Sequence, residues 1–99
     1  MTVEMHAIDH GFAISGELDM AAVGDFREFA SRVVDGKREV VLDIAELVFI
    51  DTSGISAIIR LAETDCPIGL VLRSPRDNVA RVLENLGIDD IQGIRVDPH

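Results

Sequence analysis

The segment Asp51-Thr52-Ser53-Gly54 places two hydroxyl side chains directly after a carboxylate, and no other grouping in the chain has a clearer chemical use. An apolar run ends just before it, and a stripe of apolar residues with helical spacing follows it: Ile55, Ile58, Ile59 and Ala62. The segment is therefore predicted to begin a helix, where unpaired backbone N–H groups and the helix dipole favour negative charge. A phosphate on one of its hydroxyls would find hydrogen-bond donors close by.

The residue that caps this helix is open from the sequence, because helix ends are uncertain by a residue or two. Asp51 and Ser53 are both suitable N-caps. If Asp51 is the cap, Thr52 falls in the first turn and its hydroxyl can reach solvent. The apolar residues of the helix that follows Asp51 span an arc of roughly 200°. Deep burial of the helix explains so wide an arc, and a docking face for a partner beside Thr52 is the alternative explanation.

The histidines and the single cysteine do not form a second candidate site. His6, His10, His99 and Cys66 lack the spacing of metal ligands, and Cys66 has no evident histidine partner that would activate it. The sequence also has no P-loop, no dinucleotide-binding glycine motif and no nucleophile elbow. We therefore expect no metal and no cofactor.

One class of enzyme has to be weighed against this expectation. The residues Phe49-Ile50-Asp51-Thr52-Ser53-Gly54 superficially resemble the Asp-Thr-Gly loop of aspartic proteases, which pair two aspartates across an all-β dimer. Ser53 interrupts that order, and the helical stripes of this chain oppose an all-β fold. An aspartic protease is a remote alternative, and the chain is not expected to be an enzyme.

Length and composition indicate one soluble domain that spans residues 1–99. The chain has no apolar run of about 20 residues and no secretory signal, so no membrane insertion is expected. A single cysteine excludes an internal disulfide, which favours the cytoplasm. Eighteen acidic residues against nine basic residues give a net charge of −9, which opposes direct binding to nucleic acid and can steer the domain toward a basic partner.

The first part of the chain is predicted to form a hairpin and a helix. Residues 3–8 and 12–15 have the pattern of paired strands. Gly16-Glu17-Leu18-Asp19 interrupts that pattern, and Asp19 is predicted to cap the helix. Gly36 is predicted to end the helix as a left-handed C-cap. The apolar stripe of this helix consists of Val23, Phe26, Phe29, Ala30 and Val33.

The rest of the chain alternates strands with helices. Residues 39–44 are apolar on both faces, as is typical of a central strand, and residues 68–72 form another buried strand. Between them, the helix after the Asp51 segment ends at Cys66-Pro67. Ser74-Pro75 is predicted to start a third helix, and residues 91–96 a last strand. The third helix has the apolar stripe Val79, Val82, Leu83 and Leu86, and Gly87 closes it.

The predicted order is therefore β-β-α-β-α-β-α-β, which indicates an α/β fold in a single domain. After the N-terminal hairpin, the alternation predicts parallel strands joined by right-handed helical crossovers, so the β-sheet is mixed. Residues 40–42 should lie at the centre of this sheet, and Thr52 at the start of a helix.

Three segments resemble the STAS domain family and occur in the family's order. They are Gly16-Glu17-Leu18-Asp19, the stretch from Phe49 to Ile55, and Val82-Leu83-Glu84-Asn85-Leu86-Gly87-Ile88. The second is similar to the family's phosphorylation loop, and the resemblance covers nearly the whole chain. It implies a STAS domain over residues 1–99, with a mixed sheet flanked by helices and no catalytic activity.

The resemblance also implies a function, that of a bacterial anti-anti-sigma factor (an anti-sigma factor antagonist) in transcription regulation. In such members the unphosphorylated protein binds an anti-sigma factor that is also a serine/threonine kinase, and the sigma factor is released. The kinase phosphorylates the hydroxyl residue after the aspartate, which corresponds to Thr52, and a phosphatase resets the switch. The implied partner contacts are Asp19, Asp51, Thr52, Ser53, Gly54 and Ile55, with Gly54 as the glycine that lets a partner approach closely.

The chain departs from this pattern at Thr52, where the best-known members have serine. Ser53 is therefore an alternative acceptor. Small STAS subunits of phospholipid-transport ABC systems also resemble this sequence, including the Asp-Thr pair. They bind the transporter's ATPase without being phosphorylated, so this role is the alternative to the anti-sigma factor antagonist.

Overall fold

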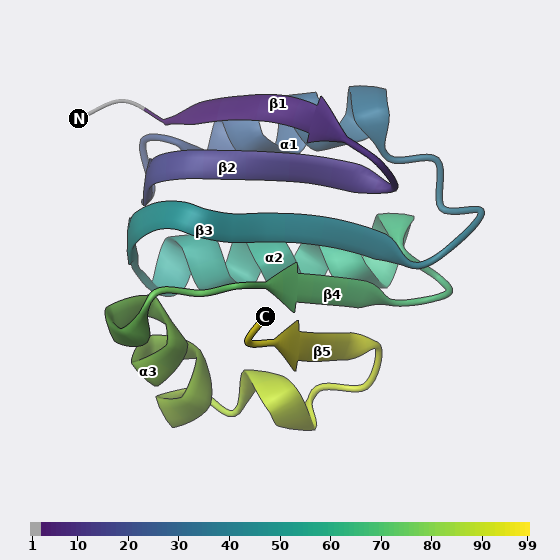
Figure 1. Ribbon diagram of the computed structural model, residues 1–99. Helices are drawn as coiled ribbons and strands as arrows, with labels where there is room; N and C mark the ends of the chain where they lie inside the picture. Colours follow the sequence, from purple (N-terminus) through teal and green to yellow (C-terminus); the bar gives the residue numbers. More distant parts are fainter. Residues whose placement is uncertain (1–2) are drawn as a thin grey trace.

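The computed structural model describes residues 3–99, and its longest strand, β3 (Val40–Ile50), lies in the middle of a five-stranded sheet (Figure 1). The alternate residues Val40, Leu42 and Ile44 of this strand are buried. The central position predicted for residues 40–42 is confirmed. Residues 1 and 2 of the predicted domain lie outside the described part of the chain.

The sheet is mixed, and its strands are neighbours in the order of the chain, from β1 to β5. β1 (Glu4–Ile8) and β2 (Gly11–Leu18) form an antiparallel hairpin. From β2 onward the pairing is parallel and continues through β3 to β4 (Leu70–Arg73) and β5 (Ile94–Asp97). The predicted α/β fold, with a hairpin followed by parallel strands, is confirmed.

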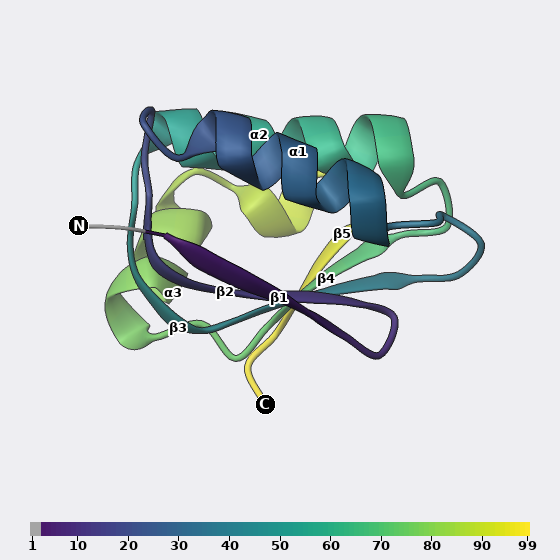
Figure 2. The ribbon, with the colours of Figure 1, turned by 90° about the horizontal axis from the view of Figure 1, so that it is seen from above.

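Helices make the connections between the parallel strands. α1 (Val23–Val33) joins β2 to β3, and α2 (Thr52–Asp65) joins β3 to β4. α3 (Asp77–Asn85) and a short 3-10 helix, η1 (Ile88–Asp90), which the sequence pattern does not predict, join β4 to β5. Figure 2 shows α1 and α2 side by side over one face of the sheet, and α3 beside one end of the sheet. These helices exclude the all-β fold that an aspartic protease would need.

The main core lies between the sheet and the layer formed by α1 and α2. Phe12 of β2 packs against two rings of α1, with centroid distances of 5.6 Å to Phe26 and 5.4 Å to Phe29. Phe12 and Phe26 are fully buried, and Ala30 is buried beside them. The apolar stripe predicted for α1 is therefore confirmed. None of the helices described in residues 3–99 is long and apolar enough to cross a membrane.

β2 is longer than the sequence pattern predicts, because it continues through Gly16 and Glu17 to Leu18. Gly16 has a φ of +94°, and the register with β3 shifts between Gly16 and Glu17. A bulge of this kind lets a strand absorb an irregular residue without ending. The predicted break at this place is wrong.

Two predicted helix caps also lie outside the helix they were expected to close. Asp19 accepts a hydrogen bond from the Ala22 N–H at 3.2 Å. The N-cap of α1 is Ala22, however, and the helix begins at Val23. The carboxylate therefore closes the turn that leads into α1. Gly36 has the predicted left-handed conformation, with a φ of +70°, but α1 has already ended at Val33.

α3 begins later than predicted, because its first residues bind the edge of β3. β4 pairs only with residues 40–43 of β3, so the carbonyls of the following residues need other partners. Arg76 Nε donates to the Ala45 carbonyl at 3.0 Å, and Asn78 Nδ2 donates to the Val48 carbonyl at 2.8 Å. The N-cap is consequently Arg76, and the prediction that Ser74-Pro75 starts this helix is wrong.

The apolar stripe of α3 is confirmed at its centre and wrong at its end. Val79 and Leu83 are buried, and Val82 packs against the core from a partly buried position. Leu86 is 49% exposed. It is the C-cap residue of α3, and Ile88 of η1 is the fully buried residue that follows it.

Phe26→Ala is expected to lower the free energy of unfolding by about 3–5 kcal/mol, because it empties the space between α1 and the sheet. Phe49→Ala is the matched control, since the Phe49 ring is 44% exposed and should cost much less. Chemical denaturation followed by circular dichroism measures both. Equal losses would contradict the assignment of Phe26 to the core.

Candidate functional site

The site begins where β2 and β3 end side by side. Leu18 is paired with Ile50, and the Asp51 N–H approaches the Leu18 carbonyl at 3.4 Å. The two segments that follow these strands, which start at Asp19 and Asp51, are therefore neighbours in space although they are far apart in the chain. This edge of the sheet brings together the first two of the three segments singled out in the sequence.

Asp51 is the N-cap of α2, which decides between the two caps that the sequence left open. Its backbone is extended, with φ −115° and ψ −174°, and its Oδ1 accepts the Gly54 N–H at 3.0 Å. Its carbonyl accepts the Ile55 N–H at 3.0 Å, which is the first bond of the helix. Thr52 is then the first residue of α2, and its prediction as the start of a helix is confirmed.

The two hydroxyl residues after the cap differ in exposure. Thr52 is exposed, whereas Ser53 is half-buried. Asp51 is the cap, and Thr52 is exposed in the first turn of α2, as expected for that case. Asp19 and Asp51 are half-buried beside it.

Gly54 and Ile55 lie inside the domain beneath the exposed residues. A Cβ on Gly54 would lie 2.4 Å from the Leu18 carbonyl oxygen and 2.8 Å from Cγ1 of Ile50. Ile55 is 5% exposed and belongs to the core. The close approach that Gly54 permits in this structure is therefore to the chain's own β2, and both residues shape the site from below.

Met20 is an exposed apolar side chain at this site that the sequence analysis did not single out. It follows Asp19 in the turn before α1, and it is 76% exposed. The available signal was weak: Met20 is an apolar residue that belongs to neither a strand pattern nor a helical stripe. Its exposure gives the site an apolar contact beside its polar groups.

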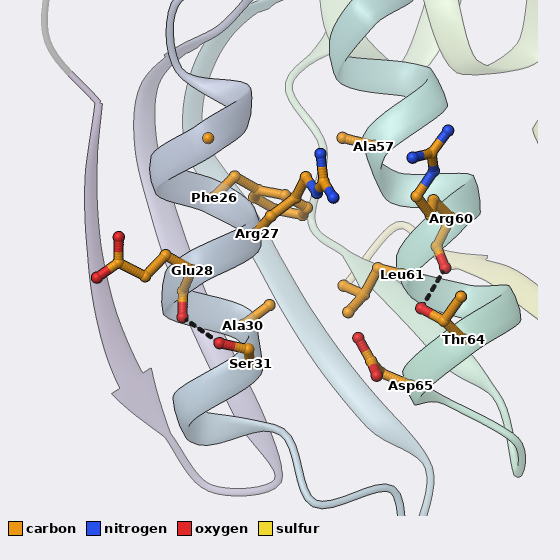
Figure 3. A pocket seen from close by; sticks show the side chains of 11 residues that line it. Phe26, Arg27, Glu28, Ala30, Ser31, Ala57, Arg60, Leu61, Thr64 and Asp65 are labelled. Carbon is orange, nitrogen blue, oxygen red and sulfur yellow. Dashed lines mark hydrogen bonds between the residues drawn. The ribbon is translucent and has the colours of Figure 1, made fainter.

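A groove lies between α1 and α2 (Figure 3). It has a volume of about 480 Å³, and Arg27 of α1 and Arg60 of α2 line it. A smaller hollow of about 180 Å³ shares both arginines and extends toward the start of α2; we call it the Arg27–Arg60 cleft. Its lining residues are Val23, Arg27, Ser53, Ser56, Ala57 and Arg60.

The titratable groups with shifted pKa values lie outside this site. Partial burial disfavours the charged form of Asp43, but the hydrogen bonds from Arg73 at 2.8 Å and from the Ala45 N–H outweigh it, so the pKa of Asp43 is lowered. Burial, helped by the charge of Asp65, raises the pKa of the Cys66 thiol to about 11. Cys66 therefore carries little thiolate at neutral pH.

Within residues 3–99, no three histidine, cysteine, aspartate or glutamate side chains gather closely enough to hold an ion. The site offers an exposed threonine as the first residue of α2, directly after the carboxylate of Asp51, and the neighbouring segment that starts at Asp19 adds a second carboxylate and the exposed Met20. This arrangement suits covalent modification and contact with another protein.

Comparison with known proteins gives a family and several similar solved structures. The STAS domain family matches residues 3–99. The crystal structure of a proposed anti-sigma factor antagonist from Thermotoga maritima is similar with a TM-score of 0.72 and 19% identity, covering 93% of this chain and 84% of that one. The structure of the anti-sigma factor antagonist SpoIIAA in its unphosphorylated form is similar with a TM-score of 0.55 and 22% identity, covering 94% and 100%. At these identities the likeness is one of fold. No curated protein sequence matches the chain.

Gly54→Ala is expected to destabilise the domain by about 1–3 kcal/mol, because the added methyl group would overlap the Leu18 carbonyl. Gly24→Ala in α1 is the matched control. A Cβ there has no neighbour within 4 Å, so the change should stabilise the domain by about 0.4–1 kcal/mol. Thermal unfolding of both variants checks that the first change lowers and the second raises the stability of the domain. A Gly54→Ala variant as stable as the native chain would contradict the close packing of Gly54 against Leu18.

Proposed function

Because this chain belongs to the STAS domain family, we propose that it is an anti-sigma factor antagonist whose unphosphorylated form binds an anti-sigma factor and thereby releases a sigma factor. The observation that carries the proposal is the position of Thr52, exposed as the first residue of α2 and directly after the cap Asp51. The names of the two similar structures support the same role. We place its action in the bacterial cytoplasm, which suits the free thiol of Cys66.

The proposed switch is phosphorylation of Thr52 by the anti-sigma factor, acting as a serine/threonine kinase, and its reversal by a phosphatase. The chain itself supplies no catalysis in this scheme. At the start of α2, backbone donors and the helix dipole favour the added negative charge, so the domain should keep its fold. In a complex the same charge would have to be desolvated. A penalty of about 4 kcal/mol would lower affinity roughly a thousandfold.

The proposed contact surface consists of the exposed and half-buried side chains of the site. Thr52, Ser53 and Asp19 supply its polar part, and Met20 supplies an apolar anchor. The carboxylate of Asp51 both caps α2 and adds negative charge to the rim. With a net charge of −9 on the whole chain, this surface fits a partner that presents basic groups.

A second role has one observation in its favour. The acceptor position holds threonine, and the STAS subunits of phospholipid-transport ABC systems resemble this sequence at the same Asp-Thr pair. Such a subunit would bind an ATPase through the same surface without being phosphorylated. Capture of partners from native lysate, identified by mass spectrometry, separates the two roles: an anti-sigma kinase supports the first and an ABC ATPase the second.

Thr52→Ala is expected to abolish incorporation of phosphate by the cognate anti-sigma kinase, because it removes the exposed hydroxyl after the cap. Ser53→Ala is the matched control and should leave most of the incorporation in place, since Ser53 is half-buried. Radiolabelled ATP and mass spectrometry of the labelled peptide measure both. Equal labelling of Thr52→Ala and the native chain would show that Thr52 is not the acceptor.

Thr52→Glu and Met20→Ser are each expected to weaken binding to the anti-sigma factor by about tenfold or more. A tenfold loss of affinity corresponds to about 1.4 kcal/mol of binding free energy. The first adds negative charge to the interface, and the second removes its apolar anchor. Ile68→Ser is the matched control for Met20, because Ile68 is 60% exposed just before β4, away from the site. Calorimetric titration measures the affinities. An unchanged affinity for both site variants would contradict the proposed contact surface.

A further inference from the structure

The Arg27–Arg60 cleft concentrates positive charge in a strongly acidic chain. The chain has nine lysine and arginine residues against eighteen acids. Arg73, Arg76 and Arg95 form ion pairs, whereas neither Arg27 nor Arg60 has an acidic partner within residues 3–99. No carboxylate lines the cleft, although Glu28 and Asp65 line the wider groove beyond it.

The two arginines reach the cleft from different helices. Figure 3 shows Arg27 extending from α1 toward α2, and Arg60 extending along α2 toward Ala57. This direction agrees with the general tilt of helical side chains toward the helix N-terminus. Both guanidinium groups therefore lie on the side of the groove that leads to the start of α2.

Ser53 lies on the same face of α2 as Arg60. Ser53, Ser56, Ala57 and Arg60 follow the spacing i, i+3, i+4 and i+7, which defines one stripe of a helix. Seven residues separate Ser53 from Arg60 by about 10 Å along the axis. A phosphoryl group on Ser53 and a guanidinium that leans back from Arg60 would together span much of this distance, and Arg27 closes the cleft from α1.

Thr52 does not share these surroundings. It is exposed, and it is not among the residues that line the cleft. One residue along a helix turns the side chain by about 100°, so neighbouring hydroxyls face different environments. Thr52 is exposed, whereas Ser53 is half-buried and lines the cleft together with Arg27 and Arg60.

We propose that the Arg27–Arg60 cleft is a receptor for a phosphoryl group carried by Ser53, which makes Ser53 a second modification site with an outcome different from that of Thr52. The phosphoryl group would come from ATP: the bond between Ser53 Oγ and the γ-phosphorus forms, the bond to the leaving ADP oxygen breaks, and the hydroxyl proton passes to a base of the kinase. Planar guanidinium groups bind phosphate oxygens through paired hydrogen bonds. The charge on Ser53 is thus neutralised within the domain, while a charge on Thr52 remains exposed to the partner. The proposal rests on the proposed function only in that a kinase must act at the start of α2.

The test uses the full chain with phosphoserine genetically encoded at position 53, compared with the full chain carrying phosphothreonine at position 52. Phosphoserine 53 is expected to raise the melting temperature by about 4–8 °C, the shift that corresponds to about 1 kcal/mol in a domain of this size. In the Arg27→Gln/Arg60→Gln background this rise should disappear. The effect of phosphothreonine 52 should be the same in both backgrounds.

A charge-matched control and a spectroscopic readout separate a local contact from a general effect of charge. Lys37→Gln/Arg81→Gln also removes two positive charges, from exposed residues that do not line the cleft, and should leave the rise intact. The Nε–H resonances of Arg27 and Arg60 should shift on phosphorylation of Ser53. A rise that survives in Arg27→Gln/Arg60→Gln, or unmoved arginine resonances, would overturn the proposal. Because the phosphate is installed without a kinase, the melting temperatures test binding of the phosphoryl group by the cleft separately from the kinase that the proposed function requires.

Discussion

The close parallel pairing of Leu18 with Ile50 is the constraint on which the site depends. It brings the ends of β2 and β3 together, so that the Asp51 N–H approaches the Leu18 carbonyl and α2 must start directly above this contact. Only a residue without a side chain fits there, and Gly54 supplies it. The position of Thr52 is therefore fixed by backbone packing and by the capping carboxylate of Asp51. The Thr52 hydroxyl has no part in holding the start of α2. A change of charge at that hydroxyl would therefore leave the shape of the site unchanged.

This arrangement divides the residues of the site into two layers. Gly54 and Ile55 are buried and hold the start of α2 against the sheet. Met20 and Thr52 are exposed above them and are free to meet another molecule. Ser53 lies between the layers, half-buried and on the side of the arginines. A modification of Thr52 and one of Ser53 would thus have different surroundings, because successive side chains of a helix point in different directions.

Much of this fold could be predicted from the sequence, because its signals are local. The periodicity of α1 and the change of period at Thr52 identify helices without any knowledge of the tertiary structure. The errors arise where distant parts of the chain meet. Ser74-Pro75 has the composition of a helix start, but the bonds of Arg76 and Asn78 to carbonyls of β3 determine where α3 begins. The convergence of Arg27 with Arg60 could not be predicted, since the two residues lie on different helices that only the fold makes neighbours.

The way α3 binds β3 has a consequence for how this sheet can grow. In the part of the chain that the structure describes, no strand pairs with β3 on its β4 side beyond Asp43. A bare strand edge is a template to which a strand of another chain can pair. Here Arg76 and Asn78 already occupy the carbonyls of Ala45 and Val48. An extended peptide would have to displace α3 before it could pair at this edge. Addition of a strand is therefore directed to the outer edges at β1 and β5, away from the interior of the sheet on which the site is built.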